Sequence, residues 1–160
     1  MRPLASRRQP GPYQLLASCL GIGYLRGGGT LAAGACGLAL YLTRRHGATW
    51  RPVPAGLLTA GLLGLGTLAA QRVEGRWGKD SSRVVVDEVA GMWVSSLLLP
   101  ATGPRLLAGL ALFRFFDIVK PLGIRRLEQL PGGLGVMADD VLAGVYTNLL
   151  LHAGRRLGYL

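Results

Sequence analysis

Acidic residues are scarce in this chain of 160 residues, which holds only eight Asp and Glu against 18 Lys and Arg. Cysteine is rarer still: there are two, so a disulfide framework is not expected. Cys19 and Cys36 both lie in apolar runs, where a free thiol behaves as a small hydrophobic residue. Charged residues make up only 16% of the chain, and the mean hydropathy is +0.36. These values are typical of a membrane protein rather than a soluble globule.

Several motifs of phosphate chemistry are also missing. The intervals from the two cysteines to the next arginine are seven and eight residues, which excludes the loop of the cysteine phosphatases. The only two histidines, His46 and His152, stand apart from any cluster of Arg and Ser, so a phosphohistidine mechanism has poor support. No Walker-type loop, GxxxxGK followed by Ser or Thr, occurs in the chain.

Basic residues are abundant, and the formal net charge is +10. They are spread between apolar segments rather than clustered in one stretch. This distribution favours anionic lipid headgroups as partners over nucleic acid. Because bases lie at both ends of successive segments, the positive-inside rule does not select a membrane orientation, and no oligomeric state follows from the sequence.

Long uncharged runs dominate the first half of the chain. Pro52–Gln71 comprises 20 consecutive uncharged residues, enough for a helix to cross a hydrocarbon core of about 30 Å. A buried helix of a soluble bundle is the alternative interpretation of this run. Two further uncharged runs, Gln9–Leu25 and Gly27–Thr43, span 17 residues each and favour the membrane interpretation. The runs lack period-two alternation, so strands are not expected.

The pattern predicts an all-α fold: a compact polytopic membrane helical bundle of about six helical segments, some of them short or re-entrant. A basic N-terminal tail (residues 1–12) would precede a single domain (residues 13–160). Only the third segment is comfortably long enough to span a bilayer. The expected segments are Tyr13–Leu25, Thr30–Thr43, Val53–Gln71, Val84–Leu99, Pro104–Val119 and Gly135–His152.

Five of the eight carboxylates lie inside or beside apolar runs of the second half, where burial of a charge is costly. Two bases, Arg114 and Lys120, accompany them closely, which leaves a local formal charge of −3 that one or two divalent cations could offset. Magnesium is the expected cofactor, because it takes oxygen ligands and commonly bridges carboxylates to substrate phosphate. Solvated helix ends are the alternative interpretation of the acid pairs. The five acids are Asp87, Glu88, Asp117, Asp139 and Asp140.

Two glycines accompany these acids at helical spacing. Gly91 lies four residues after Asp87, and Gly144 lies four residues after Asp140, so each glycine shares a helix face with an acid. Small residues let helices approach closely within a membrane. We therefore expect these two helices to cross closely beside their carboxylates.

Arg114, Asp117 and Lys120 recur at three-residue steps and would form a basic, acidic, basic stripe on one helix. Pro121 should end that helix, so Lys120 would lie at an open terminus, and Arg114 could bind a phosphate bidentately. A plain salt-bridge ladder is the alternative interpretation. The glycine loop before Thr30 could present backbone N–H groups to phosphate at the start of another helix.

Three stretches of the second half resemble motifs of the bacterial phosphatidylglycerophosphatase A family in order and spacing, and the resemblance covers residues 21–151. It implies a magnesium-dependent membrane enzyme that hydrolyses phosphatidylglycerophosphate, an anionic phospholipid, to phosphatidylglycerol and inorganic phosphate. It also implies a multi-pass protein of the bacterial cytoplasmic (inner) membrane, with its site facing the cytoplasm. The three motifs are VVVDEVAGMW (residues 84–93), FRFFDIVKP (113–121) and GGLGVMADDVLAG (132–144).

On this hypothesis the residues take separate roles. Asp117 would orient or deprotonate the attacking water, although an aspartyl nucleophile remains an open alternative. Arg114 and Lys120 would neutralise the transferring phosphoryl group, and Thr30 would help them to bind substrate. The predicted magnesium ligands are Asp87, Glu88, Asp139 and Asp140.

The sequence departs from the family at its amino-terminal motif. Gly29 and Thr30 remain, but Gly28, Ala32 and Ala33 replace the other expected residues, so a serine role there has no support.

Other interpretations stay open at this point. Asp80 is either a sixth functional acid or an N-cap. A small intramembrane cation or proton transporter would explain the acids but not Arg114 and Lys120. A non-catalytic membrane scaffold would explain the glycines and leave the acid pairs without a role.

Overall fold

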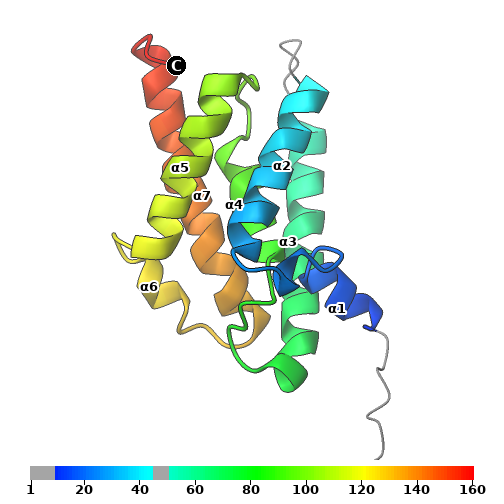
Figure 1. Cartoon of the computed structure of the whole chain (residues 1–160). Helices are drawn as coiled ribbons and strands as arrows, with labels where there is room; N and C mark the ends of the chain where they lie inside the picture. The colour runs from blue at the N-terminus through cyan, green and yellow to red at the C-terminus, as the bar shows by residue number, and fades with distance from the viewer. Residues whose placement is uncertain (1–9, 45–50) are drawn as a thin grey trace, which may run out of the picture.

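The computed structural model describes residues 10–44 and 51–160, and within these ranges the chain is all-α (Figure 1). The predicted all-α bundle is confirmed, while most of the predicted basic tail (residues 1–12) lies outside the described residues. Seven α-helices and one 3-10 helix (η1) are present in the described ranges. They are α1 (Pro12–Ala17), η1 (Ile22–Tyr24), α2 (Gly28–Arg44), α3 (Pro52–Trp77), α4 (Val86–Ser95), α5 (Gly103–Val119), α6 (Ile124–Leu127) and α7 (Gly133–Arg156).

The short helix α4 lies at the centre of the bundle, packed against α2, α3, α5 and α7 (Figure 1). Seven of its ten residues are buried, including Asp87, Gly91 and Met92. Ten residues of helix extend only about 15 Å, half of a hydrocarbon core, so α4 is a core helix enclosed by longer ones. Its position brings the first predicted acid pair to the interior of the molecule.

Glycines allow a close helix contact between α4 and α7. A Cβ atom on Gly91 would lie 2.7 Å from the main-chain oxygen of Asp140. A Cβ atom on Gly144 would overlap the main-chain oxygen of Gly91. The two main chains therefore touch where a side chain would separate them, and the predicted close crossing beside the carboxylates is confirmed.

Several predicted boundaries are wrong, each for a local reason. The expected helix Tyr13–Leu25 is broken into α1 and η1, because Cys19, Leu20 and Gly21 adopt left-handed conformations with φ of 46°, 58° and 102°. The helix expected to reach Leu99 ends at Ser95. Helix α6 was not predicted, and α3 and α7 extend beyond their expected ends.

Two helices, α3 and α7, are long and apolar enough to cross a membrane by length and composition, so the expectation of a single comfortable span is corrected. Large apolar side chains also point outward around the bundle: Leu57 on α3 is 71% exposed, Leu107 on α5 69% and Ile118 on α5 67%. An apolar exterior of this kind favours a bundle surrounded by lipid over the soluble alternative.

Candidate metal and phosphate site

Three carboxylates from two helices form the centre of the candidate site. Asp87 and Glu88 lie in the first turn of α4, and Asp140 lies on α7. One oxygen from each carboxylate lies within 4.8 Å of the others. The close crossing at Gly91 and Gly144 brings them together, because each glycine follows its acid by one helical turn.

These carboxylates are poorly compensated by the protein itself. Asp87 is 8% exposed and Asp140 is 3% exposed, and within the described ranges neither forms an ion pair with Lys or Arg. Oδ2 of Asp140 and Oε2 of Glu88 are buried without a hydrogen-bond partner. Clustered buried carboxylates with free oxygens are costly unless protonated or bound to a cation. The all-oxygen donor set fits a hard divalent ion such as Mg²⁺.

A guanidinium group borders the three carboxylates. Nη1 of Arg114 lies 2.5 Å from Oδ2 of Asp117 and 3.6 Å from Oε1 of Glu88. Asp117, in turn, interacts with Asp140. Arg114 and Asp117 are three residues apart on α5, so they share one face of that helix, as the sequence predicted. A group bound to the carboxylate cluster would therefore lie next to the guanidinium of Arg114 on the side that faces α5.

The start of α2 closes the site from another direction. A Cβ atom on Gly29 would overlap the Glu88 side chain and lie 3.3 Å from Nη1 of Arg114, so only glycine fits there without a shift. Thr30 follows in the first turn of α2 and is exposed. Among the described residues its side chain makes no hydrogen bond to the cluster.

Lys120 leaves the predicted stripe on α5. It is the C-cap residue, with a left-handed φ of 49°, and its Nζ atom lies 2.5 Å from both Oε1 of Glu128 and Oδ2 of Asp139. Burial opposes the charge on Lys120, but the two carboxylates outweigh it and raise its pKa above the ordinary value. Asp139 is therefore paired with a lysine, whereas its neighbour Asp140 belongs to the three-carboxylate cluster.

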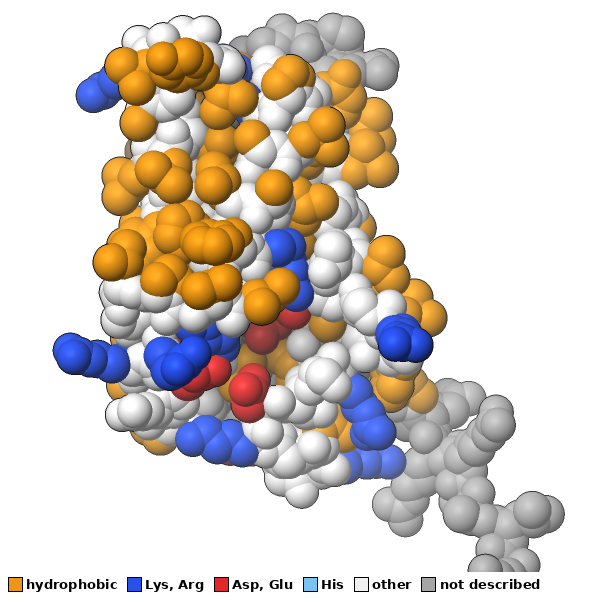
Figure 2. Space-filling view, turned by 60° about the vertical axis from the view of Figure 1, so that its left-hand side comes forward, with side chains coloured by type: hydrophobic (Ala, Val, Ile, Leu, Met, Phe, Trp, Pro, Cys, Tyr) orange, Lys and Arg blue, Asp and Glu red, His pale blue; other side chains and the backbone are white. Residues whose placement is uncertain are grey.

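A cavity of about 330 Å³ adjoins this second group. Lys79, Asp80, Glu128 and Asp139 line it, so Asp80 faces the same space as one of the predicted ligands. Glu128 was missed by sequence reasoning because it follows α6 and belongs to none of the three motifs. Figure 2 shows acidic and basic side chains gathered in a hollow on the lower half of one face, below a mainly hydrophobic surface.

The arrangement suits the binding of a phosphomonoester. Three carboxylates can hold a cation, Arg114 borders them, and Lys120 lies beside Asp139, the neighbour of Asp140 on α7. A divalent ion with these groups would offset the negative oxygens of a phosphoryl group.

Comparisons with known proteins agree with this chemistry. The family model described as "Phosphatidylglycerophosphatase A" matches residues 15–155. A "Putative phosphatidylinositol-3-phosphatase" of Bacteroides thetaiotaomicron is 52% identical over 93 residues, which cover 56% of this chain and 58% of the relative. The "Phosphatidylglycerophosphatase A" of Haemophilus influenzae is 39% identical over 92 residues, or 56% of each chain. That of Escherichia coli is 37% identical over 75 residues, or 46% of this chain and 44% of the relative.

These alignments span about half the length of the curated relatives. No solved structure gives a significant match.

Proposed function

Because the chain belongs to the phosphatidylglycerophosphatase A family, we propose that it is a magnesium-dependent lipid phosphatase. Its reaction would convert phosphatidylglycerophosphate and water to phosphatidylglycerol and inorganic phosphate. The observation that supports this proposal is the contact between the buried cluster of Asp87, Glu88 and Asp140 and the guanidinium of Arg114. A cation site beside the guanidinium of an arginine suits a phosphomonoester better than it suits an uncharged lipid.

Asp87, Glu88 and Asp140 would hold Mg²⁺. Asp139, the fourth proposed ligand, lies at the next position on α7 and is paired with Lys120. The bound ion would supply Lewis-acid chemistry and lower the pKa of a water molecule. Asp139 accepts a hydrogen bond from Lys120, which keeps that carboxylate oriented at the wall of the cavity.

Asp117 is the proposed base, or else the nucleophile. Its contact with Arg114 holds the carboxylate in place, and Arg114 in turn borders Glu88 of the three-carboxylate cluster. As a base, Asp117 would take the proton of the attacking water. As a nucleophile it would form a phosphoaspartate, which acid quenching and phosphopeptide mapping would detect. Arg114, Lys120 and Thr30 would bind the phosphoryl oxygens.

A second substrate deserves the same test, because the relative from Bacteroides thetaiotaomicron carries the name of a phosphatidylinositol-3-phosphatase. Both lipids present a phosphomonoester on a hydroxylated headgroup, with one free hydroxyl on the glycerol and several on the inositol, so the metal and arginine contacts would serve either one. The headgroup hydroxyls then decide the specificity.

The proposed location is the bacterial cytoplasmic membrane, with several spans and the acid cluster facing the cytoplasm. Two candidate spans, an apolar exterior and the family support a membrane location. The anionic phospholipid would reach the site from the bilayer, where basic residues attract it.

The test is phosphate release in non-ionic detergent from phosphatidylglycerophosphate and, separately, from phosphatidylinositol 3-phosphate, with magnesium or with chelator. Wild type should release phosphate from the first lipid only when magnesium is present. Asp140→Asn should lose this release, while Glu74→Gln, an acid of α3 outside the cluster, should keep it. Folded wild type that hydrolyses neither lipid would overturn the proposal, and cation flux in liposomes would then support the transporter.

A further inference from the structure

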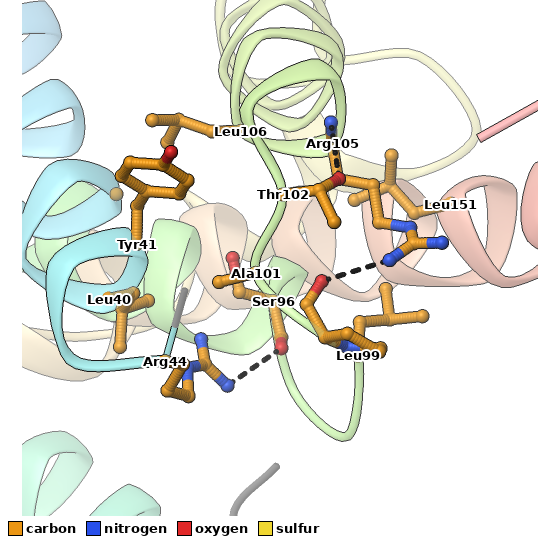
Figure 3. A pocket seen from close by; sticks show the side chains of 12 residues that line it. Leu40, Tyr41, Arg44, Ser96, Leu99, Ala101, Thr102, Arg105, Leu106 and Leu151 are labelled. Atoms are coloured by element: carbon orange, nitrogen blue, oxygen red, sulfur yellow. Dashed lines mark hydrogen bonds between the residues drawn. The ribbon is translucent and has the colours of Figure 1, made fainter. Parts of the chain in front are cut away.

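Two arginines, Arg44 and Arg105, line one cavity (Figure 3). Arg44 ends α2, whereas the carboxylates lie beside Gly29 at the start of that helix. Arg44 is 4% exposed, and its Nη1 donates a hydrogen bond of 3.4 Å to the main-chain oxygen of Ser96. Arg105 lies in the first turn of α5 and donates to the main-chain oxygens of Pro100 and Leu160, at 3.3 and 2.9 Å.

No Asp or Glu side chain accompanies the two arginines at this end. All eight acids of the sequence lie between Glu74 and Asp140, and none occurs from residue 89 to 116, the stretch that includes the loop before α5. Within the described ranges neither Arg44 nor Arg105 forms a salt bridge. The Nε atoms of both arginines are buried without a hydrogen-bond partner. The charge of Arg44 is thus met only by a neutral carbonyl oxygen, whereas Arg105 also contacts an oxygen of Leu160, the last residue of the sequence.

Burial of an uncompensated charge is unfavourable, so an external anion would stabilise this end of the protein. The first turn of α5 adds to the positive potential, because a helix of 17 residues carries a partial positive charge at its N-terminus. The cavity volume is about 20 Å³, which admits the oxygens of an anion but not a whole headgroup. The ligand would therefore sit at the mouth with its oxygens directed inward.

We propose that Arg44 and Arg105 form a second anion site, which binds the phosphate group of an anionic membrane phospholipid at the end of the bundle opposite the acid cluster. Arg44 lies 15 residues after Gly29 on α2, or about 22 Å along the helix axis. One lipid headgroup therefore cannot occupy both places. A phosphate bound here is a structural ligand rather than the substrate, and free inorganic phosphate is the other source of the same chemistry.

The test compares the thermal unfolding of full-length variants in maltoside micelles, which contain no phosphate. Added phosphatidylglycerol should raise the Tm of wild type. Arg44→Met removes the buried charge and keeps a long apolar side chain, so it should fold and lose this increase, with an apparent affinity about tenfold weaker. Arg51→Met, an exposed base at the same end, should keep the increase. Without lipid, Arg44→Met should be at least as stable as wild type.

A parallel arm uses inorganic phosphate. An increase in Tm with phosphatidylglycerol alone supports a lipid ligand, and an increase with both that Arg44→Met abolishes supports the anion site with the free ion as a competing occupant. Native mass spectrometry of Arg105→Met should show about tenfold less retained phosphatidylglycerol than wild type or Arg51→Met. The proposal is overturned if wild type gains no stability from either ligand, or if Arg44→Met and Arg105→Met both bind as wild type does.

Discussion

The carboxylate cluster and the arginine pair lie at the two ends of α2, and they balance their charges in opposite ways. At the carboxylate end Arg114 and Lys120 pair with Asp117 and Asp139, which leaves Asp87 and Asp140 without a basic partner among the described residues. At the other end the guanidinium of Arg44 donates a hydrogen bond to a main-chain carbonyl oxygen and, among the described residues, forms no ion pair. In both places the unpaired groups fit the charge of the proposed ligand, a cation at one end and an anion at the other.

The largest difference between the two ends should appear in catalysis. Asp87→Asn keeps the shape of the side chain but removes a ligand charge, so magnesium-dependent kcat/KM should fall about 100-fold or more. Arg155→Gln changes an exposed charge near the opposite end of α7 and should stay within about twofold of wild type. Phosphate release by the two variants at saturating magnesium makes the comparison. Equal activities of Asp87→Asn and Arg155→Gln would contradict the assignment of catalysis to the carboxylate end.

Gly144→Ala should cost stability where the two helices touch. The new Cβ atom would lie 3.1 Å from Cβ of Val94 and overlap the main-chain oxygen of Gly91, so α4 and α7 would have to separate. We expect a loss of about 1–3 kcal/mol in the free energy of unfolding, with weaker magnesium binding. Gly64→Ala on α3 meets no atom within 4 Å and should be neutral or stabilising by up to about 1 kcal/mol. Denaturant unfolding in detergent measures both, and a larger loss for Gly64→Ala would contradict this account of the crossing.

Lys120→Met should lower kcat/KM about tenfold, because Asp139 loses its partner and the phosphoryl group loses a positive charge. The pKa of Lys120 is raised above 10.5, so the stabilising effect of its charge is complete below about pH 10.5 and is lost as the pH rises through the folded value. The Tm difference between wild type and Lys120→Met should therefore be constant from about pH 7 to 9.5 and shrink only at higher pH. A difference that disappears near neutrality would show that Lys120 is not held as a charged group.

The smallest effect should come from Arg114→Lys, which keeps the charge but loses the planar fork. We expect KM to rise about fivefold with little change in kcat, because phosphate contact weakens while the cation site stays intact. Arg125→Lys on α6 is the matched control, since Arg125 is exposed. Steady-state kinetics separate KM from kcat, and a fall in kcat alone would assign Arg114 to the chemical step instead.

Local periodicity was sufficient to predict the crossing of α4 and α7. Asp87 with Gly91, and Asp140 with Gly144, are each one helical turn apart, so their shared faces follow from the geometry of a single helix. The all-α class of the fold was equally predictable, because long runs rich in Leu and Ala lack the period-two alternation of strands. The sequence therefore identified the two acid pairs, Asp87 with Glu88 and Asp139 with Asp140, before the arrangement of their helices was known.

Side-chain partners at chain reversals were not predictable in this way. The stripe on α5 assumed that Lys120 continues the helix, whereas its left-handed backbone turns it toward Glu128 and Asp139. Arg44 and Arg105 belong to helices that are far apart in the sequence. Only the packed bundle shows that they line one cavity, whose lining includes no Asp or Glu side chain. These features depend on tertiary contacts, which spacing along one element does not contain.

The first turn of α4 has a consequence for the order of assembly. Asp87 and Glu88 lie at the amino end of that helix, where the partial positive charge of the peptide dipoles favours carboxylates, and Oδ1 of Asp87 accepts a hydrogen bond of 3.1 Å from the main-chain N–H of Glu88. The helix end thus compensates part of the acid charge before any ion arrives. We expect the bundle to form around vacant carboxylates during membrane insertion and to acquire its metal afterwards, so that metal supply would limit activity rather than biogenesis.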